Sequence, residues 1–396
     1  MPSPFLSDRV LSLPPSATVA ANDKAKKLAA DGADIINLTA GQADFSTPDF
    51  IKDAAIKAIQ QNKTGYTPVD GVPELKRAII NKLKRDNRLE YQDNQIIVSS
   101  GVKQSLFNLT QATLNPGDEA ISLAPYWVSY PAMVQLAGAT SIIVKAGIEQ
   151  QFKITPEQLE AAITEHTKMV FFNSPSNPTG SIYSLEELQQ LGEVLLQHPQ
   201  VLIVSDDIYE YVIWDQCGFH NILNACPALY DRTIVMNGVS KAHCMTGWRI
   251  GFAACHPDLM LAMKKIQSQS TTCATSIAQY AAATAFNANK DDFFLPMLDA
   301  YQKRASWLVN ALNDFDGITC LPVKGTFYAF VDARALIQRL SLTDDMALAN
   351  HILDQAHIAT VPGTAFGCPG HLRLSFACSM QQLHSAVSRL KTLLSP

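Results

Sequence analysis

The sequence predicts an α/β protein in which a mainly parallel sheet of seven strands is followed by a smaller α+β unit. Two observations carry this prediction. From about residue 96, short apolar runs alternate with helical patterns, as in chains whose strands are joined by crossover helices. After about residue 290 the pattern changes to one long amphipathic helix, with separate strand and helix signals beyond it. A length of 396 residues leaves room for two or three such units.

The expected strands of the large unit are rich in Val, Ile and Phe. They are apolar on both faces, as strands covered by helices on both sides must be. They span residues 96–99, 120–123, 141–145, 169–173, 201–206, 233–237 and 250–254. Helix patterns lie between them, such as residues 184–197, where Ser184 and Glu187 have the spacing of a capping box.

The smaller unit is expected to contain three helices and two strands. The helices span residues 293–315, 345–356 and 381–394, and the strands span residues 326–331 and 372–376. An arm with prolines and a helix at 20–31 precede the large unit. We therefore expect three segments: residues 1–45, which pack on the small unit or on a partner subunit, the large unit at 46–290, and the small unit at 291–396.

Composition and charge exclude several classes of protein. Lys and Arg number 31 against 36 Asp and Glu, a net charge of −5, which argues against a nucleic-acid partner. Hydrophobic residues make up 47% of the chain, enough for a large core. No apolar run reaches the ~20 residues of a membrane helix, and the first residues show no signal peptide. We expect neither a membrane nor a nucleic acid as partner.

The cysteines and histidines show no metal-binding pattern. None of the eight cysteines lies before residue 217, and no two have the two-residue spacing of a zinc knuckle or redox dithiol. The nine histidines are scattered. We expect reduced thiols in a cytoplasmic protein and no metal.

Polar residues follow several of the expected strands, and ligands of open α/β sheets gather at the carboxyl ends of strands. The first strand turns through Gly101 directly into a helix, which presents backbone N–H groups suited to a phosphate. Residues 173–180 contain two prolines and a glycine, and can hold the Asn177 amide rigidly. A plain turn remains an alternative at both places. Neither a Gly-x-Gly-x-x-Gly motif nor a Walker loop is present.

Two further strand ends carry charged residues. Asp206 and Asp207 end the fifth strand, and alternation sends them to opposite faces, so only one of them enters a shared site. Lys241 follows the sixth strand, with Ser240 beside it and Arg249 eight residues later. A hydroxyl, an arginine and a helix N-terminus form a phosphate cup, and an amine beside that cup is placed to form a Schiff base.

In this order the motifs resemble those of the class I, fold-type I pyridoxal-phosphate aminotransferases, most closely the bacterial aspartate aminotransferase branch. The resemblance covers nearly the whole chain. The matching stretches are PSATVA (15–20), LTAGQADFSTP (38–48), GYTPVDGVPELK (65–76), SSGVKQSLFN (99–108), NPGDEAISLAPYWVSYP (115–131), NSPSNPTG (173–180), SDDIYE (205–210), SKAHCMTGWRIG (240–251), VPGTAFG (361–367) and HLRLSF (371–376).

The resemblance implies a role for each residue around the cofactor ring. Lys241 would carry pyridoxal 5′-phosphate as a Schiff base and then move the proton between substrate and cofactor. Asp206 would pair with the pyridine nitrogen, which makes the ring an electron sink. Tyr209 and Asn177 would hydrogen-bond the ring oxygen, and Trp127 would stack on the ring.

The resemblance also implies how the phosphate is held. The backbone of Gly101 and Val102 would bind it, together with the Ser240 hydroxyl and the Arg249 guanidinium. Tyr66 resembles a tyrosine that reaches the phosphate of the neighbouring subunit. A homodimer with shared sites is therefore expected.

The expected substrates are an amino acid and a 2-oxo acid, most specifically aspartate and 2-oxoglutarate, which would give oxaloacetate and glutamate in a ping-pong reaction. Arg373 would take the α-carboxylate through two parallel charge-assisted hydrogen bonds, and the Gly41 backbone would close over it. Lys103 would contact the side-chain carboxylate, and the alternative that it only offsets phosphate charge stays open. Trp127 and Asn177 would also contact the substrate.

Other activities on the same fold remain open. They are transamination of aromatic, neutral or prephenate-type substrates, and a pyridoxal-phosphate C–S lyase reaction. Gln42 and Ala43 replace the glutamate and proline frequent in the family, which loosens the loop near the substrate carboxylate. Pro14 stands where some relatives have a basic residue, which bears on prephenate. A ligand-binding regulator is disfavoured, because the family motifs begin near residue 15.

Overall fold

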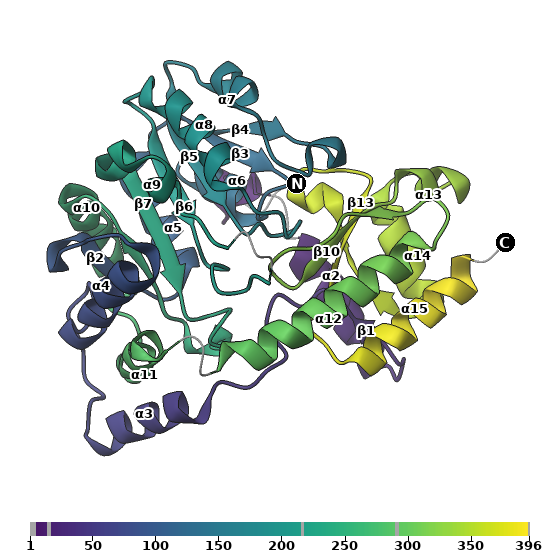
Figure 1. Cartoon of the computed structure of the whole chain (residues 1–396), viewed down its shortest axis with the longest axis horizontal. Helices are drawn as coiled ribbons and strands as arrows, with labels where there is room; N and C mark the ends of the chain where they lie inside the picture. The colour runs from purple at the N-terminus through teal and green to yellow at the C-terminus, as the bar shows by residue number, and fades with distance from the viewer. Residues whose placement is uncertain (1–4, 14–16, 215–217, 290–292, 395–396) are drawn as a thin grey trace.

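A seven-stranded sheet organises the larger part of the molecule (Figure 1). The structure is a computed structural model that describes residues 5–13, 17–214, 218–289 and 293–394, with no side chains described for 17–20. The strands lie in the order β2-β8-β7-β6-β5-β3-β4, and only β8 runs antiparallel to its neighbours. Their bounds are Ile96–Ser99 (β2), Glu119–Ala124 (β3), Thr140–Lys145 (β4), Thr167–Asn173 (β5), Leu202–Asp206 (β6), Thr233–Gly238 (β7) and Gly251–Ala254 (β8). The predicted mainly parallel sheet is confirmed.

The predicted strands differ from the observed ones by at most two residues at either end. The first matches at both ends, whereas β3, β4 and β5 begin earlier than their apolar runs. The reason is that backbone pairing continues over polar residues at the strand starts, where Glu119 pairs with both Thr140 and Thr167. Hydrophobicity predicts where a strand lies, but the ends of the strand depend on its pairing with the neighbouring strand.

Helices cover both faces of this sheet. Helices α3 and α4 both contact α11, and α5 contacts α10. The helices of this part are α3 (Asp49–Gln60), α4 (Pro73–Asn87), α5 (Val102–Thr113), α6 (Ser129–Leu136), α7 (Pro156–Ala162), α8 (Leu185–Leu196), α9 (Ile222–Ala225), α10 (Pro257–Ser268) and α11 (Ser276–Asn287). The capping box expected for α8 is present, with Ser184 accepting from the Glu187 N–H.

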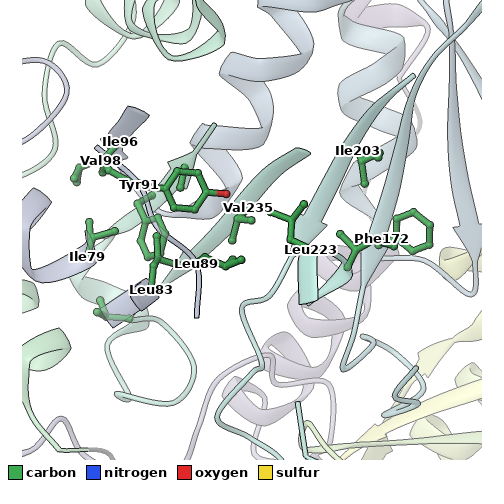
Figure 2. Close-up of a cluster of buried hydrophobic side chains, with 14 of the residues drawn as sticks. Ile79, Leu83, Leu89, Tyr91, Ile96, Val98, Phe172, Ile203, Leu223 and Val235 are labelled. Atoms are coloured by element: carbon green, nitrogen blue, oxygen red, sulfur yellow. The ribbon is translucent and has the colours of Figure 1, made fainter. Parts of the chain in front are cut away.

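Alternate residues of β2, and of the other strands except the edge strand β4, enter two different hydrophobic cores. Ile96 and Val98 of β2 pack in one cluster, and Ile97 between them packs in the other. Figure 2 shows the first cluster, where Ile79 and Leu83 of α4 lie beside the β2 residues and Val235 of β7 continues the core across the sheet. A strand apolar on both faces thus forms the middle layer of three.

The C-terminal part is built around a four-stranded antiparallel sheet, β12-β13-β10-β9, seen on the right of Figure 1. Its strands are β9 (Thr319–Cys320), β10 (Tyr328–Asp332), β12 (Val361–Pro362) and β13 (His371–Ser375), and its helices are α12 (Phe294–Asn313), α13 (Arg334–Arg339), α14 (Asp345–Ala356) and α15 (Met380–Leu394). The expected strand at 326–331 begins two residues late, because Thr326 has a left-handed φ of 66° that a strand does not accommodate.

The N-terminal segment lies against this C-terminal part. Strand β1 (Ile36–Asn37) pairs in parallel with β11 (Ile358–Ala359), and helix α2 (Ala17–Ala30) contacts β11 and β12. A short helix, α1 (Asp8–Leu11), precedes α2. Single 3₁₀ turns lie at Asp93–Gln95, Ile148–Gln150, Pro227–Arg232, Thr246–Trp248 and Gly363–Phe366. Within the described ranges, no helix combines the length and the apolar character needed to cross a membrane.

A buried ion pair joins α4 to the turn that follows β6. Lys82 has no exposed side-chain surface, and its ammonium pairs with the Glu210 carboxylate. Asn87 completes the network: its Oδ1 accepts from Lys82 Nζ at 2.6 Å, and its Nδ2 donates to Glu210 Oε2 at 2.7 Å. The network therefore anchors the turn that follows Asp206 and carries Tyr209.

We predict that Glu210→Ala destabilises the protein strongly, because it leaves the Lys82 ammonium buried without a carboxylate. Loss of one partner of a buried pair costs about 3–5 kcal/mol. The urea midpoint of unfolding should fall accordingly. The control is Glu90→Ala, which breaks the exposed pair with Lys84 and should leave the midpoint unchanged. Equal midpoints for the two variants would contradict the assignment.

Candidate active site

A cavity of about 650 Å³ lies at the carboxyl ends of the parallel strands. Ten of the residues singled out in the sequence line it: Gly41, Val102, Lys103, Trp127, Asn177, Asp206, Tyr209, Ser240, Lys241 and Arg249. Arg373 lies directly behind Asn177, and Gly101 lies against Arg249. Tyr66 is far more exposed, with 93% of its surface accessible, and it is not among the lining residues.

Asp206 presents one free carboxylate oxygen from the end of β6. Its Oδ2 accepts a hydrogen bond from the Tyr130 hydroxyl at 2.7 Å, whereas its buried Oδ1 has no partner among the described residues. Burial raises the pKa of Asp206 to about 6, and the Tyr130 hydrogen bond opposes that shift. Such an oxygen calls for a hydrogen-bond donor or a positive charge from a ligand.

Asp207 points to the other side of the strand, as alternation predicts. Its carboxylate accepts from the Ser205 hydroxyl at 2.7 Å and from the Asn221 amide. Burial is the main cause that raises the pKa of Asp207 well above its usual value. The two neighbouring carboxylates therefore do not share a proton.

Lys241 brings an amine of lowered pKa into the cavity. Its Nζ donates to the Gly41 carbonyl oxygen at 2.6 Å and lies 5.6 Å from the centre of the Tyr209 ring. Burial, followed by the nearby positive charge of Arg373, lowers the pKa of Lys241 to about 8. A sizeable fraction of the amine is thus neutral near physiological pH, as a nucleophile requires.

The turn from β2 into α5 forms an anion cup. Gly101 caps the helix with a left-handed φ of 82° and no side-chain hydrogen bond, so the first N–H groups of α5 face outward. Arg249 closes the cup, and its guanidinium donates to the carbonyls of Ser100 at 3.2 Å and Thr246 at 3.0 Å. A Cβ at residue 101 would lie 2.5 Å from Arg249 Nη2 and would displace the guanidinium, and the left-handed φ of this residue itself favours glycine.

Arg373 is a buried cation without a carboxylate. Only 3% of its surface is exposed, and no acidic side chain in the described ranges pairs with it. Its Nη groups donate to Asn177 Oδ1 and to the Thr39 carbonyl, each at 2.9 Å, and the guanidinium lies 4.3 Å from the centre of the Tyr328 ring. Its Nε has no partner among those residues. This arrangement holds a guanidinium ready for an anion from outside.

Lys103 lies beside the cup on the first turn of α5. Its Nζ is 4.8 Å from the centre of the Trp127 ring, and burial together with Arg249 lowers the pKa of its amine. Lys103 thus lies between the aromatic wall and the anion cup, and both line the same cavity.

Sequence reasoning missed four residues that hold these groups. Tyr130 supports Asp206, and the Tyr328 hydroxyl lies 3.0 Å from that of Tyr209. Asn173 accepts from the Asn177 N–H at 2.9 Å, and the Thr39 carbonyl accepts from Arg373. Asn173 ends an expected strand and could have been found by its position. Pro14, named from the sequence as bearing on prephenate, lies outside the described residues.

Together, these features define a class of protein: an α/β enzyme in which an amine of lowered pKa, an anion cup, a free carboxylate oxygen and a buried guanidinium share one cavity. Comparison with known proteins identifies the family. Residues 33–390 match the model of aminotransferase class I and II, and the chain belongs to this family. These matched residues include every candidate site residue named above.

Individual relatives agree with this membership. The chain is 53% identical to an aspartate/prephenate aminotransferase of Nitrosomonas europaea, over 98% of this chain and all of that protein. It is 47% identical to an aspartate aminotransferase of Geobacillus stearothermophilus, over 97% of this chain and 98% of the relative. A structure of aspartate aminotransferase from Thermus thermophilus with maleate superposes with a TM-score of 0.93 at 40% identity, covering 98% and 99% of the two chains. The fold-type I transferase fold expected from the motifs is thereby confirmed.

Aminotransferases of this family depend on pyridoxal 5′-phosphate, and the residues present fit that cofactor. The partnerless Asp206 Oδ1 suits a protonated ring nitrogen, and the cup at Gly101 suits a phosphate. The Lys241 amine lies in the same cavity as both. Across the described ranges, no group of three His, Cys, Asp or Glu is placed to hold a metal ion.

We predict that Lys241 in the protein stripped of cofactor reacts with amine reagents in a step that rises through about pH 8. Its pKa is lowered to about 8, so the neutral and reactive form predominates above that pH. Peptide mass spectrometry after brief reductive methylation at a series of pH values would follow the step. In Arg373→Met the midpoint should move upward, because a like charge is removed. A wild-type midpoint near 10, the ordinary lysine value, would contradict the prediction.

Proposed function

We propose that the protein is a pyridoxal-phosphate-dependent aminotransferase that converts aspartate and 2-oxoglutarate into oxaloacetate and glutamate. The observation that carries this proposal is Arg373, a buried guanidinium without a carboxylate partner in the described ranges, beside the cavity that holds Lys241. An amino acid and a 2-oxo acid each bring the α-carboxylate that such a guanidinium binds through two parallel hydrogen bonds.

The cofactor, when bound, supplies an electron sink for the bond cleavage at the substrate α-carbon. Lys241 holds it and serves as the base that moves the α-proton, a task for which an amine with a pKa of about 8 is suited. Asp206 would accept from the ring nitrogen and keep it protonated. Tyr209 and Asn177 would donate to the ring oxygen, and Trp127 would cover one face of the ring.

The cup at the start of α5 would hold the cofactor phosphate. The Gly101 N–H donates to the Ser99 carbonyl at 2.7 Å, so the Val102 N–H at the helix start would bind the phosphate, with the Ser240 hydroxyl and the Arg249 guanidinium beside it. The backbone donor of the cup is fixed by the fold and needs no reorganisation when a dianion binds. The cup would thereby fix the position of the phosphate relative to Trp127 and Asp206.

The choice of a dicarboxylic substrate rests on Lys103. A second carboxylate needs its own cation, since an unpaired charge in a dry pocket is costly. Lys103 Nζ lies over Trp127, and the Gly41 backbone lies opposite in the same cavity. The relatives are named as aspartate or aspartate/prephenate aminotransferases, which supports amino transfer over the C–S lyase alternative. Aspartate is common to these names.

We further propose that the chain works as a homodimer in the cytoplasm. Tyr66 is 93% exposed and outside its own cavity, which fits a residue that reaches the phosphate of a neighbouring subunit. The functional division would be an N-terminal segment at 1–45, a cofactor-binding part at 46–290 and a small C-terminal part at 291–396. The pairing of β1 with β11 supports the packing of the first segment on the last.

We predict that the purified protein transfers the amino group of aspartate to 2-oxoglutarate without releasing ammonia. Borohydride treatment of the cofactor-loaded protein should leave the cofactor on the peptide that contains Lys241. Lys241→Ala should lower turnover by several orders of magnitude, because the attachment and the base are lost together. The proposal would be contradicted by ammonia and pyruvate as main products, or by a label on another lysine.

We predict that Lys103→Ser lowers kcat/KM for aspartate and glutamate roughly ten- to a hundredfold, since a charge-assisted contact is worth about 1.5–3 kcal/mol. The kcat/KM for a neutral or aromatic amino acid should change much less. Steady-state kinetics on a panel of donors would measure the difference. Equal losses for acidic and neutral donors would mean that Lys103 serves the cofactor phosphate instead.

We predict that mixed dimers of Lys241→Ala and Tyr66→Phe subunits regain activity. One of the two sites in such a dimer has both an intact lysine and an intact tyrosine from its neighbour. Subunit exchange should be verified by mass spectrometry of differently labelled chains. Exchange without any gain above the Tyr66→Phe parent would exclude shared sites.

A further inference from the structure

One buried amide links the structural elements on both sides of the anion cup. Gln267, near the end of α10, has no exposed surface. Its Nε2 donates to the carbonyls of Val69 at 2.6 Å and Val98 at 2.8 Å. Its Oε1 accepts from the Ser99 hydroxyl at 2.6 Å and from Asn108 Nδ2 at 2.9 Å. All four hydrogen-bonding positions of the amide are therefore satisfied within the protein.

The partners of Gln267 flank the cup. Val98 and Ser99 end β2, immediately before the turn at Gly101, and Asn108 lies on α5, the helix that the turn begins. Gln267 is not among the residues that line the cavity. It therefore touches the strand before the turn and the helix after it, without reaching a ligand in the cup.

A second buried glutamine provides an internal comparison. Gln279 of α11 is also fully buried, and its Oε1 accepts from the Val72 N–H at 2.8 Å. Its Nε2 donates to the Thr67 hydroxyl at 2.9 Å and to the Ala274 carbonyl at 2.8 Å. Both glutamines thus hold the segment 67–72, but only Gln267 is bonded to the end of β2 and to α5.

We propose that Gln267 is a positioning residue for the phosphate group of the cofactor, an inference that rests on the proposed function. The cup includes the free backbone N–H groups at the start of α5, which cannot adjust by rotating a side chain. Their direction depends on how β2 and α5 are fixed relative to each other, and Gln267 bonds to both. A small shift of either element would misalign donors that act only over short distances.

The most direct test is Gln267→Glu, which keeps the shape but replaces the two N–H donors by an oxygen. That oxygen faces the Val69 and Val98 carbonyls, so the end of β2 should move. The measurement is a pair of dissociation constants for the full chain stripped of cofactor, one for pyridoxal 5′-phosphate and one for pyridoxal, which lacks the phosphate. Their ratio isolates the contribution of the cup, whatever the activity of the loaded enzyme.

The expected result is selective. In Gln267→Glu the preference for the phosphorylated form should fall at least tenfold, while pyridoxal binds within about twofold of wild type. The matched control Gln279→Glu also places a carboxylate in the core but should leave the preference within about twofold. Ser99→Ala removes only the hydroxyl contact to Gln267, and it should also lower the preference for the phosphorylated form. If Gln267→Glu does not fold, Ser99→Ala replaces it in the test.

Two results would overturn the inference. One is an equal loss for both ligands in the Gln267 and Ser99 variants, which would make the amide a core-stabilising group only. The other is a selective loss of the same size in Gln279→Glu. Failure of the cofactor assignment in the proposed function would look different, because the wild-type protein itself would then bind pyridoxal as tightly as its phosphate ester.

Discussion

An excess of positive charge in one partly buried cavity is the constraint on which this molecule depends. Four lysine and arginine side chains line the cavity, Lys26, Lys103, Lys241 and Arg249, and Arg373 lies directly behind it. Asp206 is the only acidic residue among the described lining residues. Buried charges are costly unless they are paired. The site is therefore organised for ligands that bring several negative charges, as a phosphate ester and a dicarboxylic acid do.

The fold separates these cations and holds each of them in a fixed position around the cavity. The parallel sheet delivers Asp206 and Lys241 at neighbouring strand ends, and the β2–α5 turn supplies N–H donors where a side-chain cap is missing. Arg373 comes from β13 of the antiparallel sheet, and its contacts with Asn177 and Thr39 tie three distant parts of the chain together. The lining residues of the cavity come from the N-terminal segment and the large part, and Arg373 of the small part lies directly behind them.

Local sequence patterns predicted the parts of this arrangement that depend on local chemistry. Strand positions, the glycine turn at Gly101 and the charged residue Lys241 after a strand all follow from short stretches of sequence. Tyr130 and Gln267 could not be found in this way, because their roles come from hydrogen bonds across 76 and 168 residues of chain. The start of β10 was misplaced for a similar reason, since the left-handed Thr326 follows from tertiary contacts.

The central claim is that each cation around this cavity binds one particular anionic group, either of the cofactor or of a dicarboxylic acid. A crystal structure of the full chain grown with pyridoxal 5′-phosphate and maleate tests this most directly. The account predicts phosphate at Gly101 and Arg249, the ring nitrogen on Asp206 Oδ1, one maleate carboxylate on Arg373 and the other near Lys103. Maleate bound away from Arg373, or a ring nitrogen without contact to Asp206, would contradict it.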